Sequence, residues 1–88
     1  MPNESEIIAR LRRRNRPNTQ VLLGIGDDGA VVKPDVGKDL IASCDLMVEG
    51  VHFRPEWTSA RLLGQKALAV NLSDVAAMGG VPKFAMIS

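Results

Sequence analysis

The sequence GIGDDG at Gly24–Gly29 matches the spacing G-x-G-x-x-G, with which a dinucleotide-binding fold holds a pyrophosphate at the start of a helix. In this chain the carboxylates of Asp27 and Asp28 occupy the turn, where they would repel a bare phosphate. Pro34 follows shortly after, so no long helix can begin there. A glycine loop with two carboxylates suits a divalent cation, which could hold a phosphate in turn. The stretch argues against a dinucleotide fold and predicts a metal-binding loop.

The composition is that of one small globular domain. Of the 88 residues, 45% are apolar and 24% are charged, and the net charge of +1 favours neither nucleic acid nor a membrane as a partner. The single cysteine, Cys44, excludes an internal disulfide, and Cys44 with the single histidine, His52, is too small a set for a zinc site. No apolar run has the length of a membrane span or forms a signal peptide, so we expect a cytoplasmic protein.

Two helices are expected. Asn3 with Glu6 three residues later resembles a capping box at the start of a short helix. Ser59 suits the N-cap of a long helix that reaches about Met78 and is closed by Gly79-Gly80. Because the long helix is apolar over much of its surface, we expect it to lie buried against a sheet.

The short helix ends in a basic run, Arg10 and Arg12–Arg14. These arginines lie at the negative end of the helix dipole and lack the interleaved aromatic residues of a nucleic-acid site. We interpret them as solvated charges that match the dipole.

Strands are expected at Val21–Ile25, with Ala30–Lys33 as its short continuation, and at Leu40–Val48. The last residues, Lys83–Ser88, read as the start of a further buried strand, which suggests that the chain is a piece of a longer protein. The strand, strand, helix, strand order is compatible with several α/β topologies.

Asp45 interrupts the apolar run of the Leu40–Val48 strand. A carboxylate in such a strand has to be paired, hydrogen-bonded or metal-bound, because removing it from water alone costs several kcal/mol. Ser43, two residues earlier, projects from the same face of a regular strand. The alternative is that Asp45 ends the strand and caps a turn.

Asp74 lies near the C-terminal end of the long helix, where the dipole disfavours an anion, and Asn71 lies one turn earlier on the same face. A nearby cation would compensate the charge. The alternative is that Asn71 or Ser73 caps a fresh short helix, which would place Asp74 at a favourable N-terminus.

Four other residues have simple interpretations. His52 beside a strand is in most proteins a hydrogen-bonded structural residue, and Cys44 a small buried apolar one. Trp57 and Phe53 are expected to be packing anchors where the strand crosses to the helix.

Four segments in this order resemble thiamine-monophosphate kinases, which belong to a wider group with aminoimidazole ribonucleotide synthetase and selenophosphate synthetase. They are Gly24–Ala30, Ser43–Asp45, Val48–Phe53 and Lys66–Gly79. The third, VEGVHF, points to the kinase rather than to its relatives. The resemblance implies an α/β (α+β) fold in which mixed or antiparallel strands carry the long helix on one face.

The resemblance also implies a reaction, the transfer of the γ-phosphoryl group of ATP to thiamine monophosphate to give thiamine diphosphate, by a homodimer that uses Mg²⁺. It assigns no general base, because the acceptor phosphate is already a nucleophile and positioning dominates this chemistry. The implied metal positions are Asp28, Ser43, Cys44, Asp45 and Asp74, the substrate contact is His52, and the supporting residues are Asp27 and Asn71.

The chain departs from the family at three points. Threonine is usual where Cys44 stands and frequent at Leu46. A thiol is a poor magnesium ligand, so Cys44 would have to contribute its backbone carbonyl. Family members are several times longer, so residues 1–88 are expected to form an incomplete N-terminal ATP- and Mg²⁺-binding domain, without the C-terminal domain and with little activity alone.

Three other functions stay open. The first is another ATP-dependent member of the same superfamily, of the synthetase or hydrogenase-maturation type. The second is a non-catalytic module that binds Mg²⁺ and nucleotide, and the third is a purely structural dimerisation domain.

Overall fold

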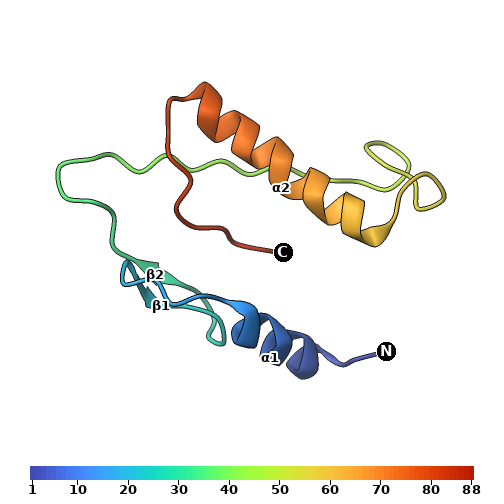
Figure 1. The fold of residues 1–88 in the computed structure, drawn as a ribbon, viewed down its shortest axis with the longest axis horizontal. Coiled ribbons are helices and arrows are strands. Elements are labelled where there is room, and N and C mark those ends of the chain that lie inside the picture. Colours follow the sequence, from blue (N-terminus) through green and yellow to red (C-terminus); the bar gives the residue numbers. More distant parts are fainter. The chain divides into compact units, whose positions relative to one another are not determined.

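The computed structural model describes residues 1–88 in two units, unit 1 at Met1–Leu40 and unit 2 at Ile41–Ser88. Figure 1 shows their elements in chain order: helix α1 (Glu4–Arg14), strands β1 (Val21–Leu23) and β2 (Val31–Val32), and helix α2 (Ala60–Ala77). The first three elements belong to unit 1 and α2 belongs to unit 2, and each unit is described by itself. Helices and an antiparallel strand pair agree with the expected mixture of α and β structure.

Helix α1 begins where the sequence predicts. The side chain of Asn3 accepts a hydrogen bond from the backbone N–H of Glu6 at 2.9 Å, an N-cap that typically stabilises a helix by about 1 kcal/mol. The helix ends at Asn15, which is extended and donates its N–H to the carbonyl of Leu11 at 3.0 Å. Acidic residues in the first turn and arginines in the last turn both match the helix dipole.

Strands β1 and β2 form an antiparallel hairpin. Val21 pairs with Val32 and Leu23 with Val31, so Leu22 is an extra residue in the register. The prediction that residues 30–33 continue the first strand was wrong, because the chain reverses in the glycine loop and β2 pairs with β1. The turn of this hairpin is the Asp27-Asp28 loop.

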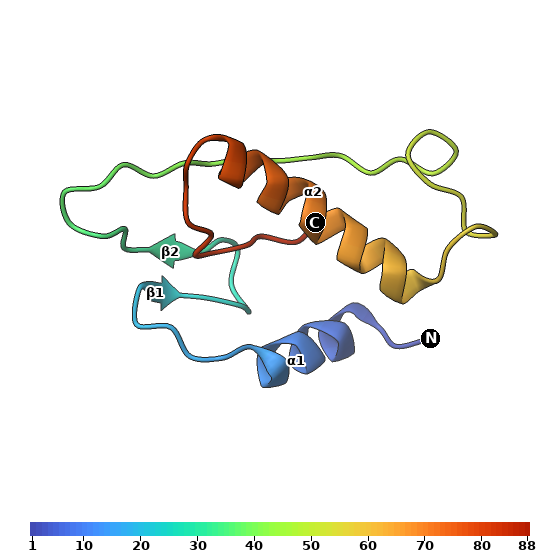
Figure 2. The ribbon, with the colours of Figure 1, turned by 45° about the horizontal axis from the view of Figure 1, so that its top comes forward.

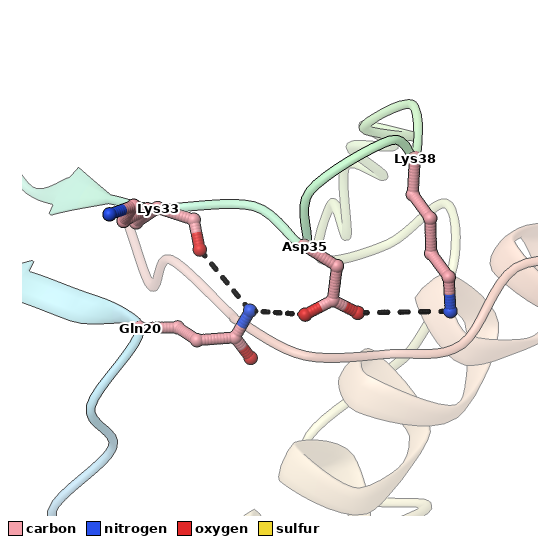
Figure 3. Close-up of polar contacts among 4 residues, drawn as sticks. All are labelled: Gln20, Lys33, Asp35 and Lys38. Atoms are coloured by element: carbon pink, nitrogen blue, oxygen red, sulfur yellow. Dashed lines mark hydrogen bonds and ion pairs between the residues drawn. The ribbon is translucent and has the colours of Figure 1, made fainter.

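The open end of the hairpin is closed by one side chain (Figure 3). Gln20 Nε2 donates to the carbonyl of Lys33 at 3.2 Å and to Asp35 Oδ1 at 2.6 Å. Lys38 Nζ lies 3.9 Å from Asp35 Oδ2, an exposed ion pair that contributes little on its own. Each Gln20 hydrogen bond contributes about 1 kcal/mol at most in this half-exposed setting. These bonds fix the strand ends opposite the aspartate loop.

Helix α2 has both of its predicted ends. Ser59 Oγ accepts from the N–H of Leu62 at 3.2 Å at the N-terminus. At the C-terminus Gly79 has a φ of +73°, and the N–H of Gly80 donates to the carbonyl of Val75 at 2.9 Å. This is a Schellman motif, which needs a left-handed residue that glycine adopts without steric cost.

The segment at 41–47 is extended but is not a strand, so the strand predicted at Leu40–Val48 was wrong. A strand needs a hydrogen-bonded neighbour, and unit 2 contains none. The segment instead runs beside α2 in both ribbon views (Figures 1 and 2). A Cβ placed on Gly80 would lie 2.9 Å from Ile41 Cδ1, so the Ile41 side chain packs at the end of α2. The terminal segment 83–88 lacks a strand for the same reason.

Neither unit buries a side chain fully. The half-buried residues of α2 form one stripe along the helix, Leu63, Ala67, Val70, Asn71 and Val75. Because unit 2 has no strand, the packing of this helix on the face of a sheet is not confirmed. No helix combines the length and the hydrophobicity that a membrane crossing requires.

The exposed apolar side chains predict how the 88-residue chain behaves in solution on its own. We expect a broad, weakly cooperative thermal transition and strong binding of a hydrophobic dye, because cooperative unfolding needs a buried core. Differential scanning calorimetry and dye fluorescence would measure this. A sharp transition with no dye binding would show that the 88-residue chain buries its apolar side chains in a core of its own.

Candidate functional site

Asp27 and Asp28 lie in the turn of the β1–β2 hairpin, with both side chains exposed. The N–H of Asp28 donates to Asp27 Oδ1 at 2.8 Å, so Asp27 orders the backbone beside it while the Asp28 carboxylate faces solvent. The roles expected from the sequence, a metal position for Asp28 and a supporting residue at Asp27, stay predictions. Strand β2 follows the loop in place of a helix, so the structure excludes a dinucleotide-binding site here.

Arg12 ties the same loop to helix α1. Its Nε and Nη2 donate to the carbonyl of Ile25 at 3.2 and 2.8 Å. The next residue, Gly26, has a φ of +117°, and a Cβ on it would lie 2.7 Å from Arg12 Cζ. Arg12 is exposed in the last turn of α1, as expected, and it also holds this loop through a contact that the sequence did not predict. The backbone conformation at position 26 favours glycine, and a side chain there would also displace the Arg12 guanidinium.

Ser43 and Asp74 come together from two parts of unit 2. Ser43 lies on the extended segment and its Oγ donates to Asp74 Oδ2 of α2 at 3.4 Å, with both side chains exposed. The residues are 31 positions apart, so this is a tertiary contact and not a local one. The contact brings two of the predicted metal positions together, and their binding of a metal ion stays a prediction.

Asp74 lies in the last turn of α2, which is unbroken from Ala60 to Ala77. The alternative in which Asn71 or Ser73 starts a fresh helix is therefore wrong. The Asn71 amide instead donates to the carbonyl of Ala67 at 2.8 Å, one turn back on its own helix. The Asp74 carboxylate thus stands at the negative end of a helix dipole, where a cation nearby would stabilise it.

Cys44 and Asp45 follow Ser43 on the extended segment, and both are exposed. The expectation that Cys44 is a buried apolar residue was wrong, because the segment is not covered by a second strand. No turn begins at Asp45, so a role as a turn cap has no support. Exposure leaves the Asp45 carboxylate and the backbone around it open to solvent and ions.

His52 lies in a turn that leads to a pocket of about 140 Å³. Lys66 of α2 lines the pocket with His52, Arg54 and Trp57. Trp57 is 76% exposed, so its expected role as a packing anchor was wrong, whereas Phe53 is half-buried. Arg54 Cζ lies 5.1 Å from the centroid of the Trp57 ring, a cation–π contact of about 0.5–1 kcal/mol at an exposed site.

The donor set fits magnesium chemically. The side chains of Asp28, Ser43, Asp45 and Asp74 offer hard oxygen atoms, which Mg²⁺ prefers, and the Cys44 thiol is the one soft atom among the predicted positions. Asp28 belongs to unit 1 and the others to unit 2. Within either unit, no three carboxylate, histidine or cysteine side chains form a group that could hold a metal ion. Each unit by itself thus presents only part of the predicted ligand set.

Lys66 and Arg12 were not singled out as site residues from the sequence. Lys66 donates to the backbone carbonyl of His52, and Arg12 donates to that of Ile25. Because every residue has a backbone carbonyl, the sequence does not indicate which one is the acceptor. The available signal for Lys66 was its position as one of two basic residues in a mostly apolar helix.

A family model described as "AIR synthase related protein, N-terminal domain" matches residues 26–88. The chain belongs to this family. The matched range contains every predicted site residue, from Asp27 to Asp74. No solved structure matches the chain.

Relatives of this AIR synthase related chain share a name. It is 44% identical over 86 residues to the thiamine-monophosphate kinase of Bacillus subtilis, which covers 98% of this chain and 26% of the relative. It is 42% identical over 92 residues to that of Rhodopirellula baltica, covering 97% and 29%. It is 48% identical over 80 residues to that of Escherichia coli K12, covering 90% and 24%. The chain thus spans about a quarter of the length of these curated relatives.

Gly26→Ala tests the link between helix α1 and the aspartate loop. In a full-length protein that carries residues 1–88, we expect it to destabilise the loop by about 1–3 kcal/mol, because alanine is strained at this φ and its Cβ displaces Arg12. Denaturant unfolding and amide exchange in the hairpin would measure the effect.

Gly29→Ala is the matched control in the same loop, because its Cβ meets nothing within 4 Å and its φ is not left-handed. We expect a change of about 0.5 kcal/mol or less. In an Arg12→Ala background, Gly26→Ala should cost less than in the parent, since the steric part is gone. Equal costs in both backgrounds would show that Arg12 does not constrain Gly26.

Proposed function

We propose that this chain forms the N-terminal, ATP- and Mg²⁺-binding part of a thiamine-monophosphate kinase. The observation that carries the proposal is 42–48% identity, over 90% or more of the chain, to the three relatives of that name. The reaction would move the γ-phosphoryl group of ATP to the phosphate of thiamine monophosphate and form thiamine diphosphate. A cytoplasmic homodimer stays a prediction from the resemblance.

Asp28, Ser43, Asp45 and Asp74 would hold Mg²⁺, with Cys44 contributing its backbone carbonyl. The Ser43–Asp74 contact and the position of Asp74 at the end of a helix dipole support this assignment. When bound, Mg²⁺ would neutralise phosphate charge so that two anionic groups can approach each other.

The remaining predicted residues would support the metal positions or contact the substrate. Asp27 holds the backbone of the aspartate loop through its bond to the N–H of Asp28, and Asn71 binds back to its own helix. His52 would contact thiamine monophosphate from the pocket it shares with Lys66. No side chain is assigned as a general base, because a phosphate acceptor is already ionised enough to attack.

Asp45→Asn and Asp74→Asn test the metal assignment. In the full-length protein, we expect each to lower kcat/KM by about 100-fold or more, since even residues that only support metal ligands cost 10- to 100-fold when changed. Steady-state assays at several Mg²⁺ concentrations would measure the loss, and raising Mg²⁺ should recover part of it. Asp39→Asn, an exposed aspartate outside the predicted set, is the control. Unchanged Mg²⁺ dependence in both site variants would remove these residues from the metal site.

A non-catalytic Mg²⁺- and nucleotide-binding module is the second candidate for the 88-residue chain by itself. The coverage favours it, because about three quarters of each relative has no counterpart in this chain. Each unit also contains only part of the predicted ligand set.

Phosphotransfer assays on the 88-residue chain and on a full-length protein distinguish the two candidates. We expect turnover of thiamine monophosphate by the full-length protein and none above background by the short chain. Calorimetry with Mg²⁺ and an ATP analogue would then show whether the short chain binds nucleotide. If the full-length protein turned over an aminoimidazole precursor and not thiamine monophosphate, it would be a synthetase of the same superfamily.

A further inference from the structure

The turn at Val48–Phe53 is closed by hydrogen bonds within itself. The N–H groups of Val51 and His52 both donate to the carbonyl of Val48, at 3.1 and 2.9 Å, and the N–H of Gly50 donates to the carbonyl of Phe53 at 2.8 Å. Gly50 has a φ of +81°, which only glycine adopts without strain. The backbone position of His52 is therefore set by local bonds before any ligand binds.

The His52 ring takes part in the same turn. Its Nδ1 accepts the N–H of Val48 at 2.9 Å, and a nitrogen that accepts in this way carries no proton. The proton of the neutral ring is then on Nε2, so Nε2 is a donor. A ring turned by 180° would place carbon against the Val48 N–H and lose the bond. The turn thus fixes both the orientation and the tautomer of His52.

Lys66 connects this turn to α2. Its Nζ donates to the carbonyl of His52 at 2.8 Å, across 14 residues of sequence. The ammonium group is charged and has three donors, so two remain for water or a ligand after this bond. Lys66 on helix α2 thus holds the backbone carbonyl of His52, while the turn orients the His52 ring.

The pocket beside His52 favours an anionic ligand. Arg54 and Lys66 line it with His52, and its other lining residues include no carboxylate. Two cations and one N–H donor around about 140 Å³ suit the oxygen atoms of a phosphate group. Trp57 adds an aromatic surface at the same pocket.

We propose that Val48 and Lys66 are positioning residues that present His52 as an Nε2–H donor to a phosphate oxygen of the acceptor substrate. Val48 acts through its backbone N–H and Lys66 through the His52 carbonyl. The inference rests on the proposed function for the identity of the substrate, but the tautomer and the turn can be measured without any turnover.

The tautomer is tested first, by nitrogen NMR of a full-length protein labelled with ¹⁵N-histidine. The His52 signals are those missing from His52→Asn. We expect a neutral ring with its proton on Nε2. A ring protonated on Nδ1, or one that exchanges rapidly between tautomers, would overturn the proposal. This result is independent of whether the protein is a thiamine-monophosphate kinase.

The substitutions His52→Asn and His52→Gln distinguish the roles of the two ring nitrogen atoms. In His52→Asn the side-chain oxygen can replace Nδ1 as the acceptor for the N–H of Val48. In His52→Gln the side-chain amide reaches the position of Nε2 and can replace it as a donor. We expect His52→Asn to keep slow amide exchange at Val48 and to weaken thiamine monophosphate binding by about tenfold, the effect of one lost bond to a charged group. Thiamine, which has no phosphate, should bind both variants as it binds the parent. Equal loss of thiamine and thiamine monophosphate binding would show that His52 does not contact the phosphate.

Lys66→Met keeps the aliphatic stem and removes the donor. We expect the KM for thiamine monophosphate to rise about threefold to tenfold, with kcat and the KM for ATP unchanged and with faster amide exchange at Val48. Lys66→Arg should restore most of the loss, because it keeps a charged donor. Arg61→Met removes the same charge from α2 at a residue that has no bond to the turn, so it should leave all four quantities unchanged.

Two results would contradict the role of Lys66. One is an unchanged KM and amide exchange in Lys66→Met. The other is a matched loss of kcat and of affinity for both substrates together with a lower Tm, which would mean a general structural role. If Lys66→Met does not fold, the proposal is tested by the His52 tautomer of the parent and by the kinetics of Lys66→Arg. A proton on Nδ1, or a KM for thiamine monophosphate in Lys66→Arg that is raised together with a lower kcat, would contradict it. If the parent fails to phosphorylate thiamine monophosphate, the proposed function fails while the tautomer measurement still stands.

Discussion

The unbroken backbone of α2 is the constraint on which unit 2 depends. The helix places Lys66 and Asp74 about two turns apart. Asp74 accepts a hydrogen bond from Ser43 of the extended segment, and Lys66 donates one to the carbonyl of His52 in the Val48–Phe53 turn. Unit 2 has no strands, and these two side-chain hydrogen bonds link α2 to the chain that precedes it. A break in the helix at Asn71 or Ser73 would have separated the two contacts and moved Asp74 to a position where a cation is not needed.

In unit 1, side-chain hydrogen bonds likewise hold the segment that carries a predicted metal position. The aspartate loop is the turn of a short hairpin, and Gln20 closes the open end of that hairpin while Arg12 holds the carbonyl before Gly26. A two-stranded hairpin is only marginally stable in water. Side-chain hydrogen bonds from Gln20 and Arg12 therefore supplement the few ladder bonds at the two ends of the hairpin.

The sequence predicted local structure well and tertiary partners less well. Both helices and both N-caps follow from residues a few positions apart, so Asn3 and Ser59 could be recognised by their spacing alone. The strand expected at residues 40–48 was wrong because a strand depends on a neighbour that the local sequence does not specify. Oxygen ligands on separate elements could be predicted as a chemical class, and one pair, Ser43 with Asp74, is in contact. Arg12 and Lys66 were missed because each bonds to a backbone carbonyl, an acceptor that every residue carries.

The exposed indole beside the His52 pocket has a practical consequence. Trp57 is the only tryptophan among the 88 residues, which contain no tyrosine, and it is 76% exposed. Any molecule that enters the pocket changes the water around this ring and the guanidinium of Arg54 stacked on it. The intrinsic fluorescence of this segment therefore has a single source, placed where ligand occupancy would alter its emission.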